Sequence, residues 1–243
     1  MLYLIGIGIE NEMGLSLRAL KIMDEADHIF AEFYTCPIDF DKNKIENVIG
    51  KKIKVLDRKG VEETSWILDA AKMGKTVFLV GGDPLAATTH SEIVKEAREE
   101  GVKVKIIHNS SVFSAVAEAG LHLYKFGKTV SLPFPKEGYF PDSPYYNIFE
   151  NSEKGLHTLL LLDIGMSANK GIELLLELEE KCGKELFSKK KKIIVCAHLG
   201  EKSYIKYSTM ADLLKRDFGD HPHCIVVPGE MHFQEEEFLK QLE

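Results

Sequence analysis

The chain has 243 residues, 44% of them hydrophobic, and a formal net charge of −7, so it can bury a sizeable core in one large or two modest globular domains. The acidic balance argues against a nucleic-acid-binding protein, which would show clustered Lys and Arg on a basic background. No segment approaches the roughly 18 continuous apolar residues of a transmembrane helix, and residues 1–6 show no secretory signal, so we expect a cytoplasmic protein without membrane contact.

Arginine and cysteine usage narrows the possible functions further. Only four of the 31 basic residues are Arg. Arg is the usual bidentate partner of carboxylate-rich and phosphate-rich ligands, so a polyanionic substrate is disfavoured. The four Cys residues form no CxxC pair, so the sequence predicts neither a disulfide framework nor a zinc site.

The first half of the chain alternates short apolar runs with amphipathic stretches, which is the pattern of βαβ units and a parallel sheet. Helices are predicted most clearly at 16–26, where Leu17, Leu20 and Met23 share one face, and at 91–100. The predicted strands of this half are 3–6, 29–32, 53–56, 76–80 and 104–107.

The character of the chain changes after Ser111. A helical stretch at 112–119 is followed by a loop-rich, aromatic stretch at 132–149, which indicates a hinge and a second domain. The predicted architecture is α/β with two domains, 1–110 and 111–243, and a cleft between them. In the second half, strands are predicted at 129–132, 159–163, 193–197 and 224–227, and helices at 168–182, 209–216 and 232–242.

The segment 81–90, GGDPLAATTH, is the most informative in the chain. It links an apolar run to a helical pattern, so it lies at the carboxyl end of a strand, where open α/β sheets bind ligands. Its glycines let backbone approach a ligand, Pro84 stiffens the turn, and Thr88 and Thr89 place hydroxyls before the helix. The alternative is an ordinary connection with an Asx turn at Asp83 and a threonine cap.

Two other strand ends are candidates for ligand contact. Gly6 and Gly8 follow the first strand, but Asn11 stands where the dinucleotide fingerprint needs a third glycine. The glycine pair therefore has two interpretations: a turn that lets the backbone approach a ligand, or an ordinary tight turn. The HNSS run at 108–111 precedes a helix and could bind a carboxylate or a ribose at free N–H groups. The same run is also close to an ordinary capping box.

Other catalytic motifs are missing. The tightest histidine cluster, 221–224, places His223 and Cys224 on opposite faces of a strand, which suits a metal poorly. His223 has two interpretations: it lies near a ligand, or it is an ordinary surface histidine. The sequence contains no GxxxxGK[ST] phosphate loop and no GxSxG nucleophile elbow.

Taken together, these segments resemble the diphthine synthases, a branch of the tetrapyrrole methylase-like methyltransferases, over nearly the whole chain. The TTH extension at 88–90 and the LYKFG run at 123–127 separate this branch from its porphyrin-modifying relatives. The resemblance rests on LIGIG (4–8), AEFYT (31–35), GDPLAATTH (82–90), IHNSS (107–111), GLHLYKFG (120–127), GLHTLLLLDI (155–164), DFGDHPH (217–223) and VPG (227–229).

The resemblance implies a two-domain fold, with a mainly parallel N-terminal sheet and a mixed C-terminal sheet, both flanked by helices. It implies a homodimer that uses S-adenosyl-L-methionine, without a metal, to methylate the aminocarboxypropyl group on a histidine of translation elongation factor 2. The residues that it assigns to the donor are Ile9, Asp83, Ala86, Ser111, Val112, Leu162, Leu199 and His223. No general base is assigned.

Methyl transfer from a sulfonium is an in-line displacement that needs mainly positioning and desolvation. A quaternary ammonium product would suit aromatic faces, and Tyr139, Phe140, Tyr145 and Tyr146 are candidates for such a wall; packing of a proline-rich loop is the alternative. The competing functions are a methyltransferase of a tetrapyrrole or corrin precursor and a non-catalytic ligand-binding module.

Overall fold

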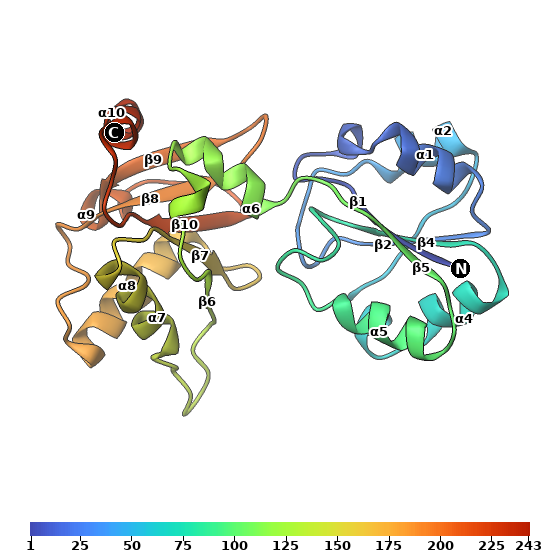
Figure 1. Cartoon of the computed structure of the whole chain (residues 1–243), viewed down its shortest axis with the longest axis horizontal. Helices are drawn as coiled ribbons and strands as arrows, with labels where there is room; N and C mark the ends of the chain where they lie inside the picture. Colours follow the sequence, from blue (N-terminus) through green and yellow to red (C-terminus); the bar gives the residue numbers. More distant parts are fainter. The chain divides into compact units, whose positions relative to one another are not determined.

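The computed structural model describes residues 1–243, and the chain divides into two compact units, Met1–Ala115 and Val116–Glu243. Each unit contains one five-stranded sheet flanked by helices (Figure 1). The predicted α/β class is therefore confirmed.

The first unit is built on an all-parallel sheet in the order β3-β2-β4-β1-β5. The central strands β1 and β4 are buried along their whole length, which is typical of a parallel sheet covered on both faces. The strands are β1 (Leu2–Gly6), β2 (His28–Glu32), β3 (Lys54–Val55), β4 (Thr76–Val80) and β5 (Val104–Ile107).

Helices cover both faces of this sheet, because alternate residues of a strand point to opposite sides. Tyr3 and Ile5 pack in one cluster with residues of α1 and α2, whereas Leu2 and Leu4 pack with residues of α4 and α5. Figure 1 shows these two helix pairs on opposite sides of the sheet. The helices are α1 (Leu17–Asp24), α2 (Lys42–Ile49), α3 (Arg58–Glu62), α4 (Trp66–Met73), α5 (Ser91–Glu99) and α6 (Val112–Ala115), with a 3₁₀ turn η1 (Glu12–Gly14).

The second unit is built on a mixed sheet in the order β6-β7-β10-β8-β9. Only β6 and β7 run parallel; the other neighbouring strands are antiparallel. A parallel first sheet and a mixed second sheet are what the resemblance implied. The strands are β6 (Val130–Leu132), β7 (Thr158–Leu162), β8 (Lys192–Ala197), β9 (Tyr204–Thr209) and β10 (His223–Val227).

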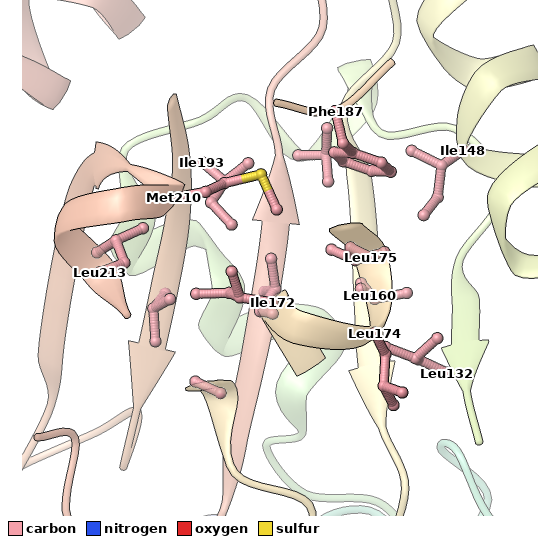
Figure 2. Packing of buried hydrophobic residues seen from close by; sticks show 14 of the residues in the cluster. Leu132, Ile148, Leu160, Ile172, Leu174, Leu175, Phe187, Ile193, Met210 and Leu213 are labelled. Carbon is pink, nitrogen blue, oxygen red and sulfur yellow. The ribbon is translucent and has the colours of Figure 1, made fainter. Parts of the chain in front are cut away.

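The main core of the second unit lies between this sheet and the helices α7, α8 and α9. Figure 2 shows Leu160 and Ile193 on the sheet, with Ile172 and Leu175 from α8 and Met210 from α9, all of them fully buried. The helices are α7 (Ser143–Glu153), α8 (Ala168–Cys182), α9 (Met210–Leu213) and α10 (Phe233–Leu239), with 3₁₀ turns η2 (Val116–Ala119), η3 (Leu123–Lys125) and η4 (Lys240–Leu242).

A buried carboxylate joins the segment before β6, the start of β7 and the C-terminal helix α10. Glu235 is fully buried. Its Oε1 accepts hydrogen bonds from the backbone N–H of His122 (2.8 Å) and from the ring of His157 (3.1 Å). Its Oε2 accepts hydrogen bonds from Lys125 Nζ (2.5 Å) and from the backbone N–H of His232 (2.7 Å). Burial alone would raise the pKa of this carboxyl, but these donors outweigh burial and hold the pKa at about 2.

Three sequence-based expectations about the second half hold only in part. The loop-rich stretch 132–149 ends in a helix, because α7 begins at Ser143 with Pro144 in its first turn. Tyr145 does not belong to an exposed aromatic wall: it is fully buried, and its hydroxyl donates to Glu179 (2.8 Å). The helix predicted at 209–216 is confined to α9, and the edge strand β9 that precedes it was not predicted.

The predicted apolar face of the first helix is correct only in part. Met23 is fully buried in α1 and Leu20 is half-buried, but Leu17 is 87% exposed. Leu17 is the first residue of the helix, directly after the cap Ser16, whose hydroxyl accepts the N–H of Ala19. Its side chain therefore precedes the turn that packs on the sheet.

Candidate functional site

Glycines bring two strand ends of the first unit into direct contact at the carboxyl edge of the sheet. Gly8 and Gly82 bond to each other in both directions (3.1 and 2.7 Å). A Cβ at Gly6 would lie 2.5 Å from the carbonyl oxygen of Gly82, and Gly8 has a φ of +91° that L side chains rarely adopt. Only glycine at these positions permits the main chains to meet at this edge.

Asp83 fixes the segment that follows β4. Its Oδ1 accepts the backbone N–H of Leu85 (3.0 Å), and its Oδ2 accepts the backbone N–H of Asn109 (3.1 Å) and lies 2.8 Å from His108 Nδ1. The Asx turn suggested for Asp83 is therefore present, and the same carboxylate also ties the loop after β4 to the loop after β5. Both oxygens already have protein donors, so Asp83 can shape this edge.

Asn109 completes the connection between the three loops. Its side-chain amide donates to the carbonyls of Gly6 (3.0 Å) and Gly14 (2.9 Å), and its Oδ1 accepts the N–H of Ser110 (2.8 Å). The ends of β1, β4 and β5 are thus held as one polar platform by Asp83 and Asn109. Sequence reasoning treated Asn109 as one member of a polar run and missed this bridging role.

We expect the substitution Gly6→Ala to disturb this platform. The new Cβ would overlap the Gly82 carbonyl oxygen, so the loops must separate. We expect the unfolding free energy to fall by about 1–3 kcal/mol. We also expect donor binding, measured by calorimetry, to weaken about tenfold or more. Gly50→Ala is the control, because nothing lies within 4 Å of the Gly50 Cβ position and only its positive φ (+66°) makes the substitution unfavourable. The control should lose stability and keep donor affinity; equal affinity in both variants would contradict the assignment.

The five donor residues expected in the first unit lie along this same edge. Ile9 follows the Gly8–Gly82 bridge, and Ser111 and Val112 stand at the start of α6. Ser111 is buried, whereas Ile9, Asp83, Ala86 and Val112 are half-buried. These positions are consistent with ligand contact, and the assignment of each remains a prediction.

The threonine cap considered for the 81–90 segment is absent. The N-cap of α5 is His90, whose side chain makes no capping bond. The hydroxyl of Thr88 is buried without a hydrogen-bond partner. The polar atoms of this segment therefore have another role than capping.

The three donor residues expected in the second unit lie together at one edge of its sheet. Because β10 is antiparallel to β7 and β8, its first residue, His223, lies opposite Ala197 at the end of β8 and next to the end of β7. Leu162 is the last residue of β7, and Leu199 follows β8. Leu162 and Leu199 are half-buried, and His223 is buried.

Both ring nitrogens of His223 are occupied by protein groups. Nδ1 accepts the backbone N–H of Ala168 (3.1 Å), so Nε2 carries the proton and donates to the carbonyl of Phe218 (3.2 Å). Burial lowers the pKa of His223, and the ring is neutral. It can offer a ligand its ring face, and it cannot serve as a hydrogen-bond partner for the donor without breaking these bonds.

Neither unit carries a preformed nucleophile or metal centre of the familiar kinds. No group of three or more His, Cys, Asp or Glu side chains is arranged around a common metal position, and no helix has the length and apolar surface needed to span a bilayer. What the first unit does offer is a rigid edge of main-chain N–H and C=O groups. Such an edge suits chemistry in which a ligand is gripped and oriented.

The comparisons with known proteins agree with this arrangement. The family model of the tetrapyrrole (corrin/porphyrin) methylases matches residues 1–217. The chain is 45% identical to the diphthine synthase of Methanocaldococcus jannaschii, an alignment that covers 100% of this chain and 98% of the relative. It is 39% identical to the diphthine synthase of Methanothermobacter thermautotrophicus, covering 100% and 95%.

Solved structures show the same fold. A crystal structure of a candidate diphthine synthase from Entamoeba histolytica superposes with a TM-score of 0.94 at 35% identity, covering 100% of this chain and 98% of that one. A crystal structure of diphthine synthase superposes with a TM-score of 0.88 at 32% identity, covering 100% and 96%. The chain therefore belongs to the tetrapyrrole methylase family, in its diphthine synthase branch, and is a methyltransferase.

Proposed function

We propose that the chain transfers methyl groups from S-adenosyl-L-methionine to the aminocarboxypropyl group on a histidine of translation elongation factor 2, in the cytoplasm and as a homodimer. The observation that carries the proposal is full-length similarity to diphthine synthases. The low Arg content supports it independently, because tetrapyrrole precursors are polycarboxylates and this chain has four Arg among its 31 basic residues. That contrast disfavours a tetrapyrrole substrate.

The donor is proposed to bind at the carboxyl edge of the first sheet. The Gly8–Gly82 bridge exposes main chain without side chains in the way, and Asp83 and Asn109 hold the surrounding loops. Ile9, Ala86, Ser111 and Val112 then offer contacts around it. Leu162, Leu199 and His223 are the corresponding proposals in the second unit.

These residues can accelerate methyl transfer mainly by positioning. The donor supplies an electrophilic methyl group on a positively charged sulfur, and the reaction needs the attacking atom held in line with the carbon–sulfur bond. A platform that is already hydrogen-bonded in the free protein does not have to be ordered during the reaction. An amine substrate must also lose a proton before its nitrogen can attack the methyl carbon.

Mass spectrometry of elongation factor 2 tests this function. The factor carrying the aminocarboxypropyl histidine is incubated with the chain and with methyl-labelled S-adenosyl-L-methionine. We expect label on that histidine and none on porphyrinogen or corrin acids offered in parallel. Methylation of the acids with the factor unmodified would establish the tetrapyrrole function, and donor binding without any transfer would establish a binding module.

A further inference from the structure

Unsatisfied polar atoms are concentrated at one place in the first unit. Five buried side-chain nitrogen or oxygen atoms have no hydrogen-bond partner, and four of them belong to Tyr34, Thr88 and His90; the fifth is the hydroxyl of Thr76. Folded proteins rarely leave such groups unpaired, because each costs about 1–3 kcal/mol. Several in one place indicate that a polar group outside the chain completes them.

Glu32 joins the two segments that carry these atoms. It is the last residue of β2, fully buried, and its carboxylate lies 3.7 Å from Nε2 of His90, which is 1% exposed. The register pairs Glu32 with Val80, the last residue of β4, so the cluster lies at the ligand-binding edge of the sheet. The AEFYT and TTH segments, on which the resemblance partly rests, therefore meet in space.

The cluster contains a buried carboxyl group and no buried cation. The Glu32 carboxylate accepts bonds from the backbone N–H (3.1 Å) and the hydroxyl (2.5 Å) of Thr35, and no Lys or Arg lies within ion-pair distance of it. The pKa of this carboxyl is raised, because burial outweighs the bonds from Thr35 and Tyr34 that lower it. Glu62 also acts on His90 and Tyr34, but its carboxylate is paired with Arg58 (2.8 Å) at the surface.

His90 contributes an acceptor and not a charge. Burial lowers the pKa of His90 to about 4, although the Pro84 carbonyl and Glu62 raise it, so the ring is neutral at pH 7. A neutral imidazole has one nitrogen that accepts a hydrogen bond. The hydroxyls of Tyr34 and Thr88 can accept as well, and the ring of Phe78 meets His90 edge-on at 5.2 Å.

We propose that Glu32, Tyr34, Thr88 and His90 form a subsite that binds the primary ammonium group of the substrate side chain before its methylation. The inference rests on the proposed function and names the substrate group that this edge receives. An ammonium has three N–H donors and a positive charge, which match the unpaired acceptors and the uncompensated carboxylate. Its charge would in turn favour the ionised form of Glu32. A carboxylate ligand would be repelled here.

The subsite lies just below the protein surface. Tyr34, Thr35, Cys36 and Thr88 are half-buried around the fully buried Glu32. The backbone of the covering segment holds Ala87 at a φ of +55°, a strained conformation for a residue with a Cβ, and strain of this kind is typical of ligand-binding segments.

Glu32→Gln tests the subsite, because it keeps the shape and removes the charge. We expect the affinity for S-adenosylhomocysteine, measured by calorimetry, to stay within about twofold, and kcat/KM for methyl transfer to elongation factor 2 to fall about 100-fold. Thr88→Val should lower kcat/KM about fivefold. Thr76→Val is the matched control: it removes the other unpartnered threonine hydroxyl, at the opposite end of β4, and should leave transfer unchanged.

The outcomes separate the subsite from other roles. A Glu32→Gln variant that transfers methyl groups within about threefold of the wild type overturns the proposal and leaves only buried water at these atoms. Parallel loss of donor affinity and transfer also overturns it, because Glu32 would then serve the donor or the fold. A wild-type chain that leaves elongation factor 2 unmodified contradicts the proposed function instead, and the subsite falls with it.

Discussion

Glu235→Gln is expected to lower the unfolding free energy by about 3–5 kcal/mol, because it removes the charge from a fully buried network and leaves a partly buried ammonium without its partner. Lys125 Nζ lies 2.5 Å from the Glu235 carboxylate, and the side chain of Lys125 is only 23% exposed. Urea denaturation followed by circular dichroism measures the loss. Glu237→Gln, on the exposed face of the same helix, is the control and should change stability little.

The pH dependence of stability offers an independent check on the same network. Because the pKa of Glu235 is held at about 2, below its ordinary 4.5, its contribution is full above pH 4.5 and is lost as the pH falls toward 2. The pKa of His157 is also lowered, by burial against the opposing effect of Glu235. Its Nδ1 accepts the backbone N–H of Gly229 (2.9 Å), so protonation would break a bond, and this term also destabilises the fold as the pH falls.

The Glu235→Gln variant should therefore show a shallower fall of stability than the wild type between pH 4.5 and 2. Identical slopes in the two proteins would show that Glu235 does not carry the acid sensitivity. A loss no greater than that of the Glu237→Gln control at pH 7 would show that the network does not hold the C-terminal helix.

Asp83→Ala is expected to weaken the binding of S-adenosyl-L-methionine about 10–100-fold. The carboxylate holds the backbone N–H groups of Leu85 and Asn109 and the ring of His108, so its removal frees two of the three loops that form the donor platform. Calorimetry with the unreactive product S-adenosylhomocysteine measures the change without turnover. Unchanged affinity would refute the role assigned to Asp83.

A matched control separates this effect from ordinary destabilisation. Asp41 forms a similar short-range bond to the N–H of Asn43 (3.0 Å) at the start of α2. Its contact with the loop after β1, to Glu12 (3.2 Å), is made by its backbone N–H, which the substitution keeps. Asp41→Ala should lower stability by about 1 kcal/mol and leave donor affinity unchanged. A loss of affinity in both variants would mean that the effect of Asp83→Ala arises from stability alone.

The sequence predicted the strands of both sheets well where apolar residues dominate. β1 and β4 are continuous runs of buried residues, as is β8 after the exposed Lys192, a pattern typical of fully covered strands. The edge strand β9 escaped prediction because all of its residues are at least partly exposed and the polar Lys206 and Ser208 leave it without a continuous apolar run. α7 escaped because Pro144 and the aromatic residues after it resemble a loop; the buried Tyr145 and Ile148, three residues apart, were the available signal.

The polar connections of the site were less predictable than its position. The segments 81–90 and 108–111 could be placed at strand ends from periodicity alone, but the bond between Asp83 and Asn109 is a tertiary contact between loops. Glu32 was indistinguishable from other residues that end a strand. Glu235 is one of three consecutive glutamates, and only its tertiary surroundings make it the buried one.

A crystal structure of the chain with S-adenosylhomocysteine tests the central claim most directly. The glycine-rich ends of β1 and β4, braced by Asp83 and Asn109, should show the ligand against the main chain of Gly8 and Gly82. Density for the ligand elsewhere in the first unit, or none at a concentration well above its affinity with the unit fully folded, would contradict the account.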